Sequence, residues 1–214
     1  MKIDSLIERR KLRRKVQGIA AALLPFASDG CVAVEAFQRH LAATQRAGLM
    51  NAVNMDTGYV NYLDHAQKEE VLRWTREALG SNVPFVAGAY IEGQSDNGPG
   101  DVAALYRREM ERIVALGGIP ILFQTTRLHG KSAEEKAAAY REICRGFPRV
   151  LAFELGPMFA PNGEIFDEET VRRLMDIPEL AGMKHSSLDR MVELGRLALR
   201  DEHRPEFQDR KSVV

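Results

Sequence analysis

The sequence has few of the features that mark specialised classes of protein. Its 214 residues contain two cysteines and one tryptophan, and 30 basic side chains balance 30 acidic ones, so the net charge is zero. This composition excludes a disulfide-built scaffold and a protein drawn to nucleic acid or to an anionic membrane by its overall field. No apolar run approaches the roughly 18 residues of a membrane span. With 45% hydrophobic and 28% charged residues, the chain instead predicts a soluble globular protein with one main domain.

The cysteines and the N-terminal charge give no targeting or metal signal. Cys31 and Cys144 lie far apart and fit no metal-binding spacing, so we interpret them as reduced thiols of a cytoplasmic protein. The segment IERRKLRRK is basic, but it lacks the apolar region of a signal peptide. We therefore predict a basic N-terminal helical segment over residues 1–16, which packs by its apolar side chains.

Two patterns alternate along the rest of the chain. Short apolar runs with strand character precede longer stretches with helical periodicity, and the helical stretches open on capping residues or close on glycine. The expected strands are 18–26, 49–55, 83–90, 119–125, 149–155 and 181–185, and the expected helices are 34–48, 64–80, 101–118, 132–146, 167–177 and 187–200. This makes six βα units with strands that read as buried on both faces, as in a covered parallel sheet.

Two architectures fit repeated βα units: an open doubly wound sheet and a (β/α)8 TIM barrel. The first βα turn, LLPFASDG, has no glycine fingerprint for a pyrophosphate, and no P-loop occurs elsewhere. We therefore predict an α/β fold of the (β/α)8 barrel type over residues 17–200, with only about six units present. Residues 201–214 are expected to form a polar tail, too short to supply two more units. Its last part, QDRKSVV (208–214), has neither strand pattern nor helix end, so the chain reads as C-terminally truncated.

Three segments resemble one family of barrel enzymes. GIAAALLPFASDG (18–30) is similar to the first strand and loop of the dihydrodipicolinate synthase and N-acetylneuraminate lyase family of class I aldolases. MDTGYVNYLDHAQKEEV (55–71) resembles that family's Gly-Thr-Thr-Gly-Glu motif with its following helix start, and AGMKHSSLD (181–189) resembles the strand that carries the Schiff-base lysine. The resemblance covers residues 17 to 200 and points to an uncharacterised, divergent subgroup of that family.

The resemblance places Lys184 in the position of the Schiff-base lysine. Strands of a barrel end on one face, where their last residues surround the active site. Partial desolvation there disfavours the charged form of an amine, which leaves more free amine to attack a carbonyl carbon. The resulting iminium permits cleavage or formation of the neighbouring C–C bond. Other residues expected at this face are Phe26, Asp56, Thr57, Tyr90, Gln124, Thr125, Glu154 and His185.

Departures from the family pattern bear on mechanism and substrate. The tyrosine that relays protons at the end of the fifth strand corresponds to Glu154, which we take as a candidate proton-transfer group. The paired tyrosines after the fourth strand are replaced by FQTTRLHG, so that relay is absent as well. Asp56 stands where the family has the first threonine of its carboxylate-binding pair, and Thr57 keeps the second position. Because Asp56 would repel a ketoacid carboxylate, we predict a keto or sugar-like substrate other than pyruvate.

The predicted site comprises Lys184 and Glu154 as catalytic residues, with substrate bound by Asp56, Thr57, Gly58, Gln124 and His185. No cofactor is expected. The expected partners are a small carbonyl compound and further copies of the chain, since the resemblance implies a homo-oligomer.

Two other hypotheses stay open. Carboxylate and imidazole groups at strand ends are the ligands of metal-dependent barrel isomerases and lyases, although no HxH or HExxH spacing occurs here. The residues concerned are Asp56, Glu92, His129, Glu154 and His185. Alternatively, an incomplete barrel with unpaired edge strands is a fragment with impaired catalysis.

Overall fold

The structure is a computed structural model, and it describes residues 3–8, 17–93 and 101–211. The contacts group the chain into two compact units. Unit 1 consists of residues 1–15, 95–107 and 122–214, and unit 2 of residues 16–94 and 108–121. Each unit is described by itself below, and one long helix, α4, has residues in both.

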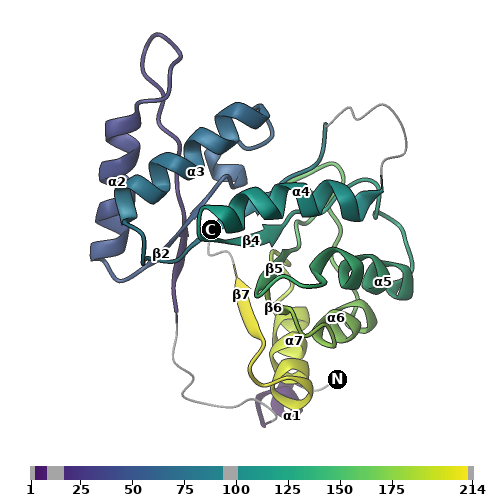
Figure 1. Cartoon of the computed structure of the whole chain (residues 1–214). Coiled ribbons are helices and arrows are strands. Elements are labelled where there is room, and N and C mark those ends of the chain that lie inside the picture. The colour runs from purple at the N-terminus through teal and green to yellow at the C-terminus, as the bar shows by residue number, and fades with distance from the viewer. Residues whose placement is uncertain (1–2, 9–16, 94–100, 212–214) are drawn as a thin grey trace. The chain divides into compact units, whose positions relative to one another are not determined.

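The predicted alternation of strands and helices is confirmed in all six units (Figure 1). The strands are β1 (Ile19–Ala21), β2 (Met50–Val53), β3 (Phe85–Ala89), β4 (Gly118–Leu122), β5 (Val150–Phe153) and β6 (Leu180–His185). The helices that follow them are α2 (Val34–Arg46), α3 (His65–Leu79), α4 (Val102–Ala115), α5 (Ala133–Cys144), α6 (Glu168–Met175) and α7 (Arg190–His203). Every residue of β3 and β5 is buried, as expected for parallel strands covered on both faces.

Side-chain caps explain why several helices begin where they do. Asp64 accepts a hydrogen bond from the backbone N–H of Gln67, whose side chain in turn accepts from the backbone of Asp64. Ser132 and Glu135 form the same reciprocal capping box at α5. Each box satisfies two backbone donors that the first helical turn leaves without partners. The sequence therefore determines these two helix starts locally.

Unit 2 contains a parallel sheet in which β2 lies between β1 and β3. Strand β1 ends at Ala21 and is shorter than the predicted 18–26, and Pro25, which has no N–H to donate, cannot extend the ladder. The chain instead turns back on itself, and Phe26 pairs antiparallel with Val32. The first βα connection is thus a small hairpin loop.

In unit 1, strand β6 pairs in parallel with β5 on one side and with a further strand, β7 (Gln208–Lys211), on the other. Residues 208–211, in which the sequence shows no strand pattern, form this strand. Helix α7 runs to His203, and β7 pairs along β6 from Gly182 to His185. The polar sequence QDRK gave no apolar signal, and the pairing with β6 forms this strand.

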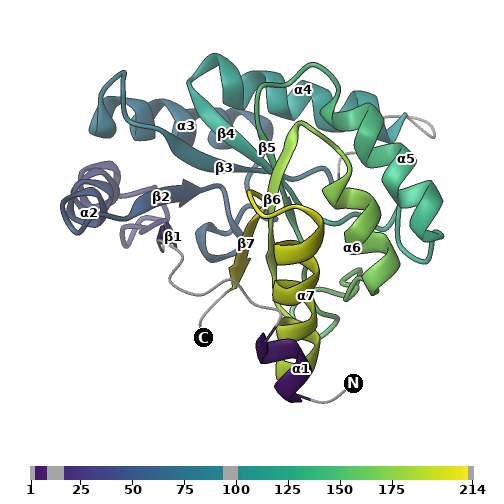
Figure 2. The ribbon, with the colours of Figure 1, turned by 90° about the horizontal axis from the view of Figure 1, so that it is seen from below.

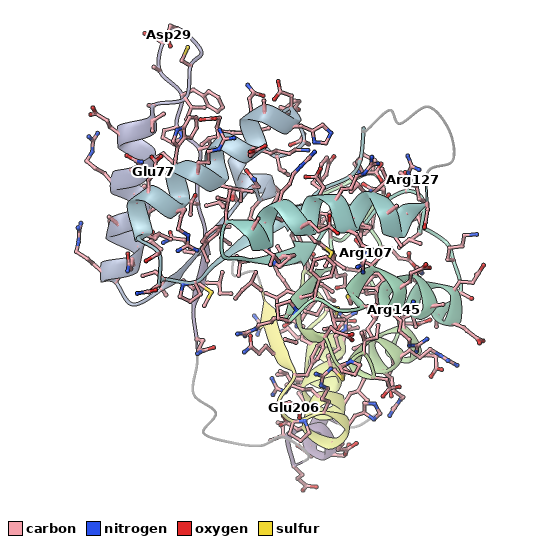
Figure 3. The ribbon with its side chains drawn as sticks, in the orientation of Figure 1. Asp29, Glu77, Arg107, Arg127, Arg145 and Glu206 are labelled. Atoms are coloured by element: carbon pink, nitrogen blue, oxygen red, sulfur yellow. The ribbon has the colours of Figure 1, made fainter. Side chains whose placement is uncertain are left out.

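Helices α5, α6 and α7 cover one side of the unit 1 strands (Figure 2). Arg107, in the first half of α4, ties that segment to the end of α5, because its guanidinium donates to the carbonyl oxygen of Arg145 at 2.7 Å and stacks on Phe147 (Figure 3). Helix α1 (Ile3–Glu8) contacts α7, and the rest of the predicted N-terminal helical segment lies outside the described residues. Within those residues, no helix is both long and apolar enough to cross a bilayer.

Candidate active site

The side chains at the ends of the unit 1 strands point to two different faces. Consecutive residues of a strand alternate between faces, and register partners of parallel strands share one. Lys184 on β6 is in register with Phe153 on β5. The Phe153 ring packs edge-on against that of Phe123, which follows β4, with centroids 4.9 Å apart. These three side chains therefore lie on one face of the unit 1 sheet.

Lys184 is half-buried, and its Nζ atom lies 3.8 Å from the centroid of the Phe153 ring. A ring face attracts a cation, so this contact fixes the position of the amine above the end of β5. In a (β/α)8 barrel the helices lie outside. Helices α5 to α7 cover the other face of this sheet, so Lys184 occupies the interior face of the fold.

Glu154 points to the helix side. Its two carboxylate oxygens accept hydrogen bonds from the Arg196 guanidinium at 2.8 and 2.7 Å, and one of them also accepts from the backbone N–H of Phe166. Both side chains of the ion pair are buried, with Glu154 at 0% and Arg196 at 4% exposure. The carboxylate is therefore bound to Arg196 on the face away from Lys184, and the expected proton-transfer role stays a prediction.

Gln124 also differs from its predicted substrate-binding role. Its side-chain oxygen accepts from the backbone N–H of Leu155 at 2.9 Å and of Glu164 at 3.3 Å, and its amide nitrogen donates to the Glu164 carbonyl at 2.6 Å. The amide therefore fastens both ends of the β5–α6 connection to the end of β4. A group with all these backbone partners has little capacity left for a ligand.

His185 is 2% exposed and follows Lys184 on β6, so strand alternation turns it to the other face. The next residue, Ser186, donates its hydroxyl to the Glu154 carbonyl at 2.8 Å and accepts from the backbone N–H of Gly156 at 3.1 Å. The prediction that His185 binds substrate beside Lys184 is therefore not supported by the geometry of the strand.

The other predicted substrate-binding residues belong to unit 2. Asp56, Thr57 and Gly58 form a short 3-10 turn directly after β2. The carboxylate-bearing Asp56 is exposed, whereas the Thr57 hydroxyl donates to the carbonyl of Ala22 at 3.4 Å. Gly58 is buried, and a Cβ atom there would lie 3.4 Å from the same carbonyl oxygen. The turn thus packs against the end of β1, and a common substrate for these residues and Lys184 stays a prediction.

A second lysine, buried on helix α3 of unit 2, lies beside a tyrosine that follows strand β3. Lys68, on the first turn of α3, is 7% exposed, and its Nζ lies 5.3 Å from the centroid of the Tyr90 ring after β3. Burial lowers the pKa of Lys68, partly offset by the nearby carboxylate of Glu109. The pKa of Tyr90 is raised, mainly by burial and also by Glu92. Tyr90 therefore stays protonated at neutral pH.

The residues proposed as metal ligands do not gather in one place. Within residues 3–8, 17–93 and 101–211, no three His, Cys, Asp or Glu side chains are grouped so that they could hold a metal ion. His129 is an exposed loop residue whose Nδ1 lies 4.0 Å from Glu164. Unit 1 has a small pocket, but it lies beside α5, where Gln124, Lys136, Tyr140 and Phe166 help to line it.

Comparison with known proteins supports the fold. No family model and no curated protein sequence matches the chain. Among solved structures, similar ones are dihydrodipicolinate synthase from Bacillus anthracis (TM-score 0.74, 16% identity), dihydrodipicolinate synthase from Thermotoga maritima (0.72, 17%) and N-acetylneuraminate lyase from Mycoplasma synoviae (0.67, 16%). In the same order, the three alignments cover 92, 93 and 91% of this chain. This chain spans 64, 64 and 62% of the length of those proteins.

The chain therefore has the α/β fold of the (β/α)8 barrel type, as the sequence predicts, over the part of the barrel that it spans. The resemblance to dihydrodipicolinate synthases and N-acetylneuraminate lyases is confirmed at the level of the fold.

The sequence-based interpretation missed Phe153 and Phe123 as the residues beside Lys184. The motif comparison placed Glu154 in the tyrosine position because both precede a proline after the fifth strand. Strand alternation could have corrected this, since Phe153 is the register partner of Lys184. A shift of one residue moves a side chain to the opposite face.

Proposed function

We propose that the chain acts as a Schiff-base lyase of the class I aldolase type on a small keto or aldehyde compound. The observation that carries this proposal is the place of Lys184 near the C-terminal end of β6, on the interior face of a barrel fold shared with lyases. Active sites of (β/α)8 enzymes lie at that end of the strands.

The proposed chemistry needs only the amine and the carbonyl compound. The free amine of Lys184 attacks the carbonyl carbon, and the adduct loses water to give an iminium. The iminium draws the electron pair of a neighbouring C–C bond when that bond breaks, and the reverse reaction forms the bond. Phe153 offers no group that exchanges protons, so water or the substrate itself supplies these protons.

The proposal excludes pyruvate as the substrate. Asp56 is an exposed carboxylate on the turn after β2, and it would repel the carboxylate of a ketoacid. Hydroxyl groups of a keto or sugar-like compound can instead donate hydrogen bonds to Asp56. We further propose a homo-oligomer in the cytoplasm. The support for this compartment is that Cys31 and Cys144 are free thiols.

Borohydride reduction of the protein in the presence of a panel of keto and aldehyde compounds tests the proposal. The expected result is a mass adduct on Lys184 with at least one compound, and no adduct in Lys184→Arg. Lys131→Arg, which alters a half-exposed lysine paired with Glu135, serves as the matched control and keeps the adduct. A protein that gives no adduct on Lys184 with any compound does not have the proposed activity.

Two further results bear on the competing hypotheses. Adduct formation is expected to be unchanged by chelators, whereas a metal-dependent enzyme loses its activity. Efficient trapping of pyruvate on Lys184 would show that the substrate prediction based on Asp56 is wrong.

A further inference from the structure

The exposed large hydrophobic side chains of unit 1 gather in two places. Within the part of unit 1 that the structure describes, two of them belong to α1 and the other four follow β5 and β6 directly. The four, called the apolar rim below, are Met158 (67% exposed), Phe159 (47%), Leu188 (62%) and Met191 (39%). A contiguous group of such side chains at one end of a sheet marks a surface that binds something.

The two rim segments lie against each other. The backbone N–H of Gly156 donates to the Ser186 hydroxyl at 3.1 Å, which joins the start of the β5–α6 connection to the end of β6. A Cβ atom at Gly156 would lie 3.7 Å from the Ser186 carbonyl oxygen and 3.8 Å from the Phe159 ring. Phe159 therefore lies beside the segment that carries Leu188 and Met191.

Lys184 and the rim belong to the same two strands and the connections that follow them. Phe153 is the last residue of β5, and its ring and that of Phe123 form an apolar floor beside Lys184. Lys184 is the penultimate residue of β6, so the chain leads from the amine to the rim within a few residues. Floor and rim thus belong to the same end of the unit 1 strands.

Three polar side chains at this end of the unit 1 strands are bound to other protein groups. Glu154 is held by Arg196, Gln124 by the backbone of the β5–α6 connection, and Ser186 by the backbone of Glu154 and Gly156. A hydroxylated substituent placed among the rim side chains would lose hydrogen bonds to water without replacement. An alkyl or aryl substituent is instead stabilised there by the removal of its apolar surface from water.

We propose that the apolar rim binds an alkyl or aryl substituent of the carbonyl compound that reacts with Lys184. This inference rests on the proposed Schiff-base function and narrows its substrate class from small carbonyl compounds in general to those with an apolar group beside the carbonyl carbon. Within that class, compounds that carry only hydroxyl groups beside the carbonyl carbon are then poorer substrates than those with an apolar group there.

The test compares borohydride trapping on Lys184 for butanal and benzaldehyde with trapping for glycolaldehyde and glyceraldehyde. Each rate is divided by the rate of the same aldehyde with Nα-acetyl-lysine, which removes differences in carbonyl reactivity. We expect the corrected rates of the apolar aldehydes to be at least about tenfold higher, which corresponds to about 1.4 kcal/mol. Equal rates, or faster trapping of the hydroxyaldehydes, overturn the inference while the Schiff-base function stands.

Variants locate the effect on the rim. Met191→Ser is expected to lower the apolar preference by roughly threefold, the effect of losing about one buried methylene. Leu49→Ser is the matched control, because Leu49 has a similar exposure of 40% but precedes β2, at the opposite end of a strand. If Met191→Ser leaves the preference unchanged and instead lowers the oligomeric state in sedimentation, the rim is a contact between copies and the inference is wrong.

A binding measurement keeps the inference testable without any imine. With ¹³C-methyl methionine, the methyl resonances of Met158 and Met191 should shift on addition of benzyl alcohol and stay in place with glycerol. Absence of a shift with benzyl alcohol overturns the inference. Absence of every Lys184 adduct alongside a clear shift leaves the apolar site in place and refutes the Schiff-base function.

Discussion

The Nζ atom of Lys184 lies 3.8 Å from the centroid of the Phe153 ring, and the two residues are in register on neighbouring parallel strands. This pair defines the candidate active site better than any motif does. It shows which face of the sheet the amine occupies, and it places a side chain without a titratable group beside the amine.

The ring of Phe153 should restrain the reactivity of Lys184. A cation over a ring face is stabilised by about 0.5–1 kcal/mol where water still reaches it, so removing the ring leaves more of the free amine. We expect Phe153→Leu to trap a reactive aldehyde roughly two- to fivefold faster at neutral pH. Phe166→Leu is the control, because Phe166 is also a buried ring beside a lysine, Lys136. Slower trapping in Phe153→Leu than in this control would contradict the restraint.

Glu154→Gln separates a structural role from a catalytic one. A proton-transfer group typically contributes a factor of about 10²–10⁴ to the rate. As it titrates, the rate falls on one side of the pH–rate profile. Because the Glu154 carboxylate is committed to Arg196, we expect the variant to keep the profile and, per folded molecule, to change the trapping rate by less than about threefold. If the variant no longer shows the fall of the rate on one side of the pH–rate profile, Glu154 has the proton-transfer role that the sequence predicted.

Arg196→Met should destabilise the fold strongly. It leaves the Glu154 carboxylate, which is 0% exposed, without its partner, and breaking a buried pair in this way costs about 3–5 kcal/mol. Arg173→Met is the matched control, because the pair of Arg173 with Glu169 is exposed and worth about 0–1 kcal/mol. Urea unfolding of both variants measures the difference. A loss below about 1 kcal/mol in Arg196→Met would show that the buried pair is unimportant.

Gln124→Leu should loosen the connection between β5 and α6. The substitution removes three backbone hydrogen bonds, to Leu155 and Glu164, each worth about 0.5–1.5 kcal/mol. We expect faster amide hydrogen exchange in residues 155–166 than in the wild type, and no such change in α2. Gln45→Leu, on the half-buried end of α2, is the control. Unchanged exchange in residues 155–166 would mean that the Gln124 amide does not hold this connection.

Stability should fall at alkaline pH through Cys144. Burial raises the pKa of this thiol from its ordinary value of 9.0 to about 12. Between these values the folded state keeps the thiol proton while the unfolded state loses it, so the free energy of unfolding falls by up to about 1.4 kcal/mol per pH unit as pH rises. Below pH 9 this contribution is fully present.

The measurement is the difference between wild type and Cys144→Ala in urea unfolding at several pH values above 9, under reducing conditions. Lys68, whose pKa burial lowers, contributes with the opposite sign, so the difference between the two proteins isolates the thiol. Cys31→Ala alters the exposed cysteine and should keep the wild-type slope. Equal slopes in wild type and Cys144→Ala would show that Cys144 does not titrate in this way.

The sequence by itself determined the order of the elements. Apolar runs followed by amphipathic stretches predict six βα units, because burial on both faces and capping by Asp64 or Ser132 are local properties of the chain. It also determined the position of Lys184 near a strand end. These features depend on periodicity and on neighbours a few residues away.

The tertiary structure decided which residues accompany Lys184. Glu154 and Phe153 are adjacent in sequence, yet one pairs with Arg196 on the helix side and the other lies under the amine, since strand neighbours point to opposite faces. Strand β7 likewise depends on the ladder that β6 offers, because its polar sequence carries no strand signal of its own. Register and pairing join residues far apart in the chain, and periodicity along the chain does not contain that information.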